Sequence, residues 1–68
     1  MLFDLPSDIA GQKLQQDDLV WFAFDADDLV RGIVREAGPV DGQMLVAIQS
    51  TKDADVIRWV NPKGIVKV

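Results

Sequence analysis

Carboxylates are the side chains best suited to acid–base chemistry or metal binding in this 68-residue chain, because it has no His and no Cys. Their densest run is residues 25–28, Asp-Ala-Asp-Asp, with Asp17 and Asp18 a few residues earlier. A calcium loop of the D-x-[DN]-x-[DN]-G type needs further ligands and a glycine, and this run lacks that glycine. We therefore expect a solvated turn, and we predict no catalytic residue, no metal site and no cofactor.

Three aromatic side chains, Trp21, Phe24 and Trp59, are candidates for lining a groove that binds a small molecule or a peptide. Aromatic side chains offer large apolar surfaces, and the faces of their rings also attract cations. An aromatic cage that holds a methylated cation needs several such rings around one site. Residues 43–55 contain no aromatic side chain, so the sequence does not supply a complete cage. A ligand groove is one alternative, beside the simpler interpretation that these rings belong to the core or to an interface.

Three arginines, Arg31, Arg35 and Arg58, could contact an anion if the fold brings them to one face of a sheet with Trp21. The chain has seven basic and eleven acidic side chains, a formal net charge of −4 and a sequence pI of about 4.4. A nucleic-acid-binding domain usually carries a basic patch and has a pI above about 9. We expect ion pairs with nearby aspartates, and nucleic acid is the least favoured partner.

The elements that would position these side chains are predicted to be short β-strands. Residues 1–17 are interrupted by Pro6 and Gly11, and they form an N-terminal arm with apolar anchors at Leu2, Phe3, Leu5, Ile9 and Leu14. Residues 18–68 are rich in strand-forming side chains, and they are punctuated by turn dipeptides such as Gly-Pro and Asp-Gly. The predicted strands are 19–24, 29–36, 43–49, 56–60 and 65–68. Five short strands at intervals of about ten residues indicate one all-β domain, a small barrel or sandwich.

The order of these pieces resembles the SH3-like small barrel, particularly its Tudor-type layout. The resemblance covers residues 16–68 and rests on Gln16-Asp17-Asp18 before the first strand, Arg31-Gly32-Ile33-Val34 within the second, and one short break between the last two strands. It implies a five-stranded SH3-like barrel over residues 18–68. We expect the N-terminal arm of residues 1–17 to be docked, either on its own barrel or on a neighbouring subunit. Barrels of this kind serve many unrelated functions, so the resemblance by itself assigns no activity.

One group of enzymes provides a precedent among such barrels, the type II dihydrofolate reductases, which act as tetramers around a shared pore. That family has Val-Gln-Ile-Tyr on its fourth strand, whereas the matching positions here are Val56-Ile57-Arg58-Trp59. Because the Gln and the Tyr are absent, we predict a protein that is not an enzyme.

Alternation along the predicted strands leaves apolar side chains on both faces of the sheet. We assign four sets to the core: Val20, Phe22 and Phe24; Val30, Gly32 and Val34; Met44, Val46 and Ile48; and Ile57 and Trp59. A sheet with one solvated face would be polar on the other side, but that side here includes Leu19, Trp21, Ile33, Leu45 and Val60. Long strands shared between two sheets, or a covering arm, could account for this excess. We favour a homo-oligomer that buries these five side chains.

The small size of the chain favours the same conclusion. A domain of this length buries only about 60% of the surface of its unfolded chain, so its stability is marginal. Without cysteine no disulfide can add stability, and a partner subunit is a common substitute. The first residues do not resemble a signal peptide, and no apolar run approaches the roughly 18 residues of a membrane span. We predict a cytoplasmic, non-enzymatic binding or assembly module that forms a homo-oligomer, with no membrane contact and with a peptide or small molecule as the alternative partner.

Overall fold

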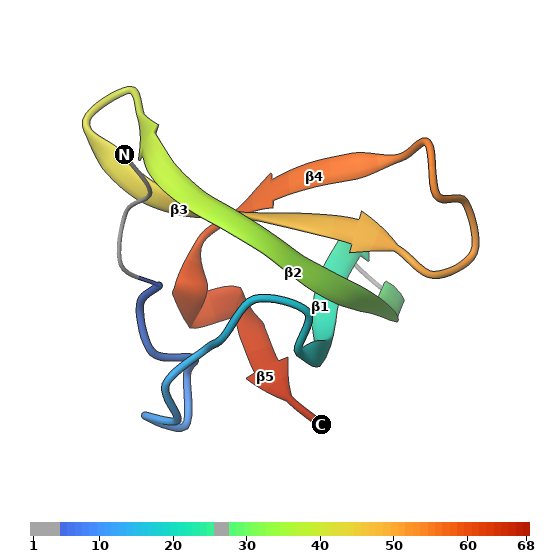
Figure 1. Ribbon diagram of the computed structural model, residues 1–68, viewed down its shortest axis with the longest axis horizontal. Coiled ribbons are helices and arrows are strands. Elements are labelled where there is room, and N and C mark those ends of the chain that lie inside the picture. The colour runs from blue at the N-terminus through green and yellow to red at the C-terminus, as the bar shows by residue number, and fades with distance from the viewer. Residues whose placement is uncertain (1–4, 26–27) are drawn as a thin grey trace.

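Five strands and one short 3₁₀ helix make up the fold in this computed structural model, which describes residues 5–25 and 28–68, apart from the side chains of Phe24 and Asp25. The elements are β1 (Leu19–Asp25), β2 (Asp28–Val40), β3 (Gln43–Ser50), β4 (Ile57–Val60), η1 (Pro62–Gly64) and β5 (Ile65–Lys67). All neighbouring strands are antiparallel, and they lie in one sheet in the order β4-β3-β2-β1-β5, so that β4 and β5 are its edges (Figure 1). The prediction of an all-β fold is confirmed.

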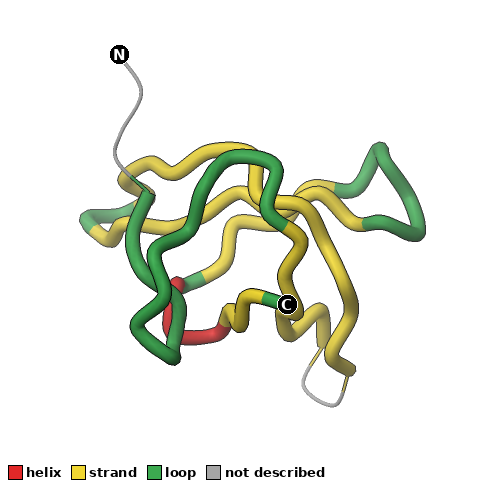
Figure 2. The backbone as a smooth tube through the Cα atoms, turned by 60° about the horizontal axis from the view of Figure 1, so that its bottom comes forward, coloured by secondary structure: helices red, strands yellow, loops and turns green. Residues whose placement is uncertain are grey.

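The sheet is curved because β2 pairs with different neighbours along its length. The 13 residues of β2 pair with β1 through Asp28–Ile33 and with β3 through Gly32–Val40. A register shift between Val34 and Glu36 marks a bulge in β2, and a bulge bends the strand that contains it. The molecule measures 28 × 26 × 22 Å, and Figure 2 shows strands that curve instead of lying in one plane.

The hydrophobic core lies on one face of this curved sheet, which we call the core face. Its buried members come from four strands and from the N-terminal segment: Leu14, Val20, Phe22, Val34, Ala37, Val46, Ile48 and Ile65. Residues paired across antiparallel strands point to the same side, and the pairs Phe22–Ile65 and Val34–Ile48 join these members across strands. The opposite side of the sheet is the outer face.

The assignment of Ile57 and Trp59 to the core was wrong. In β4 it is Val60 that pairs with Val46 and packs against the core, so Ile57 and Trp59 point to the outer face, where they are 52% and 44% exposed. Both alternate sets of this short strand are apolar, and for that reason the register with β3 decides which set is buried. Met44 is also exposed, because it lies near the tip of the β2–β3 hairpin, opposite Pro39.

The β2–β3 hairpin turns through Asp41 and Gly42. Val40 pairs with Gln43, so only these two residues form the loop, and their φ angles are 51° and 81°. Positive φ at both central residues is typical of the type I′ turn, whose twist matches that of the flanking strands. The sequence predicted a turn at Asp-Gly, and the structure has it there.

The N-terminal segment of residues 5–17 lies against β5 and contributes Leu14 to the core (Figure 1). The N–H of Ile9 donates to the carbonyl of Ile65 at 3.0 Å, and Asp8 accepts from the backbone of Lys67. Near the start of β1, Asp17 N–H donates to Val34 O at 2.8 Å. The predicted anchors Leu2 and Phe3 lie outside the described residues.

Candidate interaction face

The outer face carries a patch of apolar side chains on the adjacent strands β5, β1 and β2. Leu19 pairs with Ile33 of β2, Trp21 pairs with Val66 of β5, and the N–H of Val68 donates to Leu19 O at 3.1 Å. Cross-strand partners share a face of the sheet, so these five side chains lie next to one another. We call Leu19, Trp21, Ile33, Val66 and Val68 the outer patch. Ile33 is half-buried and the other four are exposed, with Trp21 at 40% and Val68 at 65%.

Arg31 extends the outer patch at the position beside Trp21. The two residues are cross-strand partners, and the guanidinium carbon of Arg31 lies 5.7 Å from the centre of the Trp21 ring. At this distance the cation is attracted to the face of the indole. This contact places one positive charge at the edge of an apolar surface.

Three of the five side chains predicted at an oligomer interface come together in the outer patch: Leu19, Trp21 and Ile33. Leu45 is on the outer face as well, but it is half-buried and pairs with Gly38 on the other side of the β2 bulge. Val60 does not belong to this surface, because it packs against the core. Its placement at an interface is corrected here, for the same reason of register that applies to Ile57 and Trp59.

Two of the three side chains predicted to line a ligand groove, Trp21 and Trp59, are too far apart in the sheet to line one groove together. Trp21 is on β1 and Trp59 is on β4, and β2 and β3 lie between them in the sheet. The Trp59 ring instead lies over Gly38, since a Cβ atom at Gly38 would be 3.7 Å from its Cζ3 atom. The side chain of Phe24 lies outside the described part of the structure.

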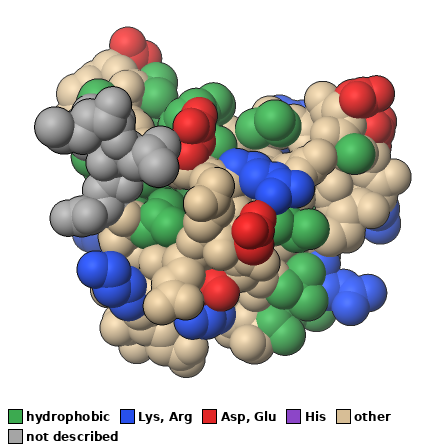
Figure 3. All heavy atoms as spheres, in the orientation of Figure 1, with side chains coloured by type: hydrophobic (Ala, Val, Ile, Leu, Met, Phe, Trp, Pro, Cys, Tyr) green, Lys and Arg blue, Asp and Glu red, His purple; other side chains and the backbone are tan. Residues whose placement is uncertain are grey.

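The three candidate anion-binding arginines are divided between the two faces. Arg35 is held on the outer face by Asp17, at 2.7 Å from Nη1 to Oδ1, and by Gln49, at 2.6 Å from Nε to Oε1. Arg58 pairs in register with the core residue Ile48 and is therefore on the core face of β4. In Figure 3 the basic side chains are interspersed with acidic and apolar ones. The three arginines therefore do not converge on one face with Trp21, which was the condition for a shared anion site.

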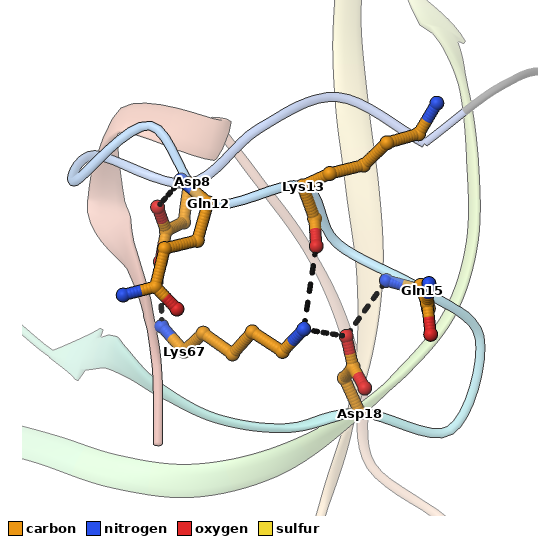
Figure 4. Close-up of polar contacts among 6 residues, drawn as sticks. All are labelled: Asp8, Gln12, Lys13, Gln15, Asp18 and Lys67. Carbon is orange, nitrogen blue, oxygen red and sulfur yellow. Dashed lines mark hydrogen bonds and ion pairs between the residues drawn. The ribbon is translucent and has the colours of Figure 1, made fainter.

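Asp8 is a structurally important carboxylate whose full set of contacts the sequence did not indicate. One of its oxygens, Oδ1, accepts from the N–H groups of Ala10 at 3.0 Å and Gln12 at 2.8 Å, as expected of a residue that caps a turn. The other, Oδ2, accepts from Lys67 N–H at 2.8 Å (Figure 4). The backbone N–H of Lys67 is the main cause of a lowered pKa for Asp8, and the other two N–H groups act in the same direction against the effect of burial.

The side chain of Lys67 makes a second set of contacts between β5 and the N-terminal part of the chain. The Nζ atom of Lys67 lies 3.2 Å from Asp18 Oδ2 and donates to Lys13 O at 3.4 Å, while Asp18 Oδ2 also accepts from Gln15 N–H at 2.8 Å (Figure 4). Lys67 therefore contacts the N-terminal segment through both its backbone and its side chain. The N-terminal segment thus covers the edge of β5 that does not pair with β1.

Neither a metal site nor a membrane-spanning helix is found within residues 5–25 and 28–68. No group of three or more His, Cys, Asp or Glu side chains in those ranges is arranged to hold a metal ion. No helix there is long and apolar enough to cross a membrane. Two residues of the predicted acidic turn, 26 and 27, fall outside the described ranges.

Comparisons with models of protein families, with curated proteins and with solved structures find no match to this chain.

Proposed function

We propose that this protein is a non-enzymatic binding or assembly module that acts as a homo-oligomer through its outer patch. The observation that carries the proposal is the juxtaposition of Leu19, Trp21, Ile33, Val66 and Val68 on three adjacent strands of one face. Scattered apolar side chains are normal on a protein surface, but a contiguous group is typical of an interaction site. A second copy of the chain would present the same apolar surface in return.

The small size of the domain supports this proposal. The described core is built around eight buried side chains, and a 68-residue domain is near the lower limit of independent stability. Apolar area removed from water stabilises a protein by about 25 cal/mol per Å². Burial of the outer patch between subunits would add such area without any change in the fold of each subunit.

We also propose that the fold is a small barrel of the SH3-like kind. The strand order β4-β3-β2-β1-β5, the shared long strand β2 and the single 3₁₀ turn between β4 and β5 support this proposal. No contact between described residues favours the groove or the nucleic-acid alternative over assembly.

The test of the proposed assembly is light scattering with size-exclusion chromatography, from low to high micromolar protein concentration. We expect a mass above that of the 7.5 kDa monomer, and we expect it to fall with dilution. Leu19→Thr, which keeps a strand-forming residue but removes part of the patch, should shift the equilibrium towards monomer. Ile9→Thr is the matched control, because Ile9 is 61% exposed but lies in the N-terminal segment. A strict monomer at high micromolar concentration contradicts the proposal.

A further inference from the structure

The two edges of the sheet differ in how their backbone groups are satisfied. At the β5 edge, Ile65 O accepts from Ile9 N–H and Lys67 N–H donates to Asp8, so the N-terminal segment occupies the place of a neighbouring strand. At the other edge, no backbone hydrogen bond within residues 5–25 and 28–68 reaches β4 from its open side. An unpaired edge is a template for another strand.

The pairing of β4 with β3 identifies which groups this edge presents. Ser50 N–H donates to Val56 O at 3.0 Å, and the register Gln49–Ile57 sets these two residues opposite each other, so they occupy a hydrogen-bonded position of the ladder. Such pairs alternate in an antiparallel ladder, so Arg58 and Val60 also direct their backbone groups towards β3. The N–H and C=O groups of Ile57 and Trp59 then point to the open side, and both side chains are exposed on the outer face.

We propose that two copies of this chain pair through β4, antiparallel about a two-fold axis at Trp59, to form one continuous sheet. The inference rests on the proposed function, since its partner is a second copy. The outer face is continuous from the outer patch to this edge, because Ile33 pairs with Gln49 and Gln49 pairs with Ile57. Pairing at β4 therefore makes the outer faces of both subunits one continuous surface.

The register follows from the length of the extended segment and from charge. Backbone from Ile57 to Asn61 is extended, with Asn61 at φ −64° and ψ 134°, and its midpoint is Trp59. An axis there sets Trp59 opposite Trp59 of the second copy and Arg58 opposite Val60. An axis at Arg58 would bring two like charges together, which destabilises a strand pair. Reciprocal bonds join the Trp59 residues. On either side, Ile57 N–H donates to Asn61 O of the other copy and Asn61 N–H donates to Ile57 O. Asn61 O also accepts from Gly64 N–H within its own chain, and a carbonyl oxygen can accept two such bonds.

Cysteine cross-linking tests this register directly, because the chain has no cysteine of its own. In the proposed dimer, Trp59→Cys places two Cα atoms about 5.5 Å apart, within the range of about 4.4–6.8 Å for a disulfide. Ile57→Cys is the matched control, with its two copies four residues apart along the strands, about 14 Å. Under mild oxidation we expect covalent dimer from Trp59→Cys at least about tenfold faster than from Ile57→Cys.

A second pair of variants tests whether the backbone N–H of Ile57, on the open side of β4, takes part in the proposed pairing. Ile57→Pro removes an N–H that points away from β3 and sets ring atoms at the open edge, and proline is tolerated at the first residue of a strand. Ile57→Thr removes the apolar side chain but retains the N–H. We expect Ile57→Pro to weaken dimerisation about tenfold relative to Ile57→Thr, as the loss of two symmetry-related hydrogen bonds implies.

The possible results separate this inference from the proposed function. If light scattering shows an oligomer but Trp59→Cys cross-links no faster than Ile57→Cys, pairing through β4 is wrong and assembly through the outer patch remains. If the unmodified chain is monomeric at every concentration, both proposals fail. Fast cross-linking at residue 59, with Ile57→Pro weaker than Ile57→Thr, supports pairing through β4.

Discussion

Gly32 is the position in β2 where a single methyl group should be most damaging. A Cβ atom built on Gly32 would lie 2.7 Å from Phe22 Cε1, even closer to Ile48 Cγ2, and 3.0 Å from the backbone oxygen of Gln49. Phe22 and Ile48 are both fully buried, and a backbone oxygen cannot move by a change of rotamer. Gly32→Ala therefore forces the core apart between β1 and β3.

The size of this effect follows from two opposing contributions. Overpacking of a core costs about 1–3 kcal/mol, and three close contacts in a rigid site place Gly32→Ala near the upper end. Replacing glycine by alanine also lowers the conformational entropy of the unfolded chain, which offsets the loss of stability by about 0.4–1 kcal/mol. The net loss is about 2 kcal/mol, a large fraction of the roughly 3–10 kcal/mol expected for a domain of this length. At about 4–8 °C per kcal/mol, the Tm should fall by about 8–16 °C.

Thermal and urea unfolding of Gly32→Ala and Gly38→Ala provide the assay and its control. Gly38 is also in β2, but a Cβ atom there would be 3.7 and 3.8 Å from two atoms of the Trp59 ring, which is ordinary contact. We expect Gly38→Ala to leave the Tm unchanged or raise it by a few degrees. An unchanged Tm for Gly32→Ala, or equal losses for both variants, would refute the packing described at Gly32.

Three further predictions concern a turn, an ion pair and the N-terminal segment. Gly42→Ala should lower the unfolding free energy by about 1–2 kcal/mol in urea, through its φ of 81° alone, since nothing lies within 4 Å of a Cβ there. Asp17→Asn should cost less than about 1 kcal/mol in the same assay, because its ion pair with Arg35 is exposed to solvent. The lowered pKa of Asp8 implies stability that is present above about pH 4 and is lost as the pH falls through the lower folded-state value. Asp8→Asn should therefore lower the Tm at pH 7 and flatten the acid limb of a Tm–pH profile, and a parallel profile would contradict the role of its carboxylate.

The strands and turns with strong local signals were predictable from the sequence. The Asp41-Gly42 turn is an example, because positive φ at two adjacent positions favours that dipeptide. The sequence pattern predicts that the second strand ends at residue 36, because Gly-Pro at 38–39 favours a turn. In the structure β2 continues to Val40, and the bulge after Val34 accommodates the change of direction.

The candidate site was only partly predictable, because its members meet through pairings between distant parts of the chain. Leu19, Trp21 and Ile33 follow from alternation within two neighbouring strands. Val66 joins them only through the pairing of β5 with β1, which no local pattern indicates. The sequence predicts Val60 on the wrong face of the sheet. The four residues of β4 include apolar side chains in both alternate sets, so alternation alone does not show which set faces the core.

The bond from Lys67 N–H to Asp8 also has a consequence for the kinetics of folding. Its two residues are 59 positions apart, so the chain must lose a large closure entropy before this bond can form. Contacts of such high sequence separation slow folding, and those absent from the transition state act mainly on the unfolding rate. If the N-terminal segment docks after the rate-limiting step, a weakened Asp8 contact leaves refolding unchanged and shortens the lifetime of the native state. The segment would then determine how long the fold persists rather than how quickly it forms.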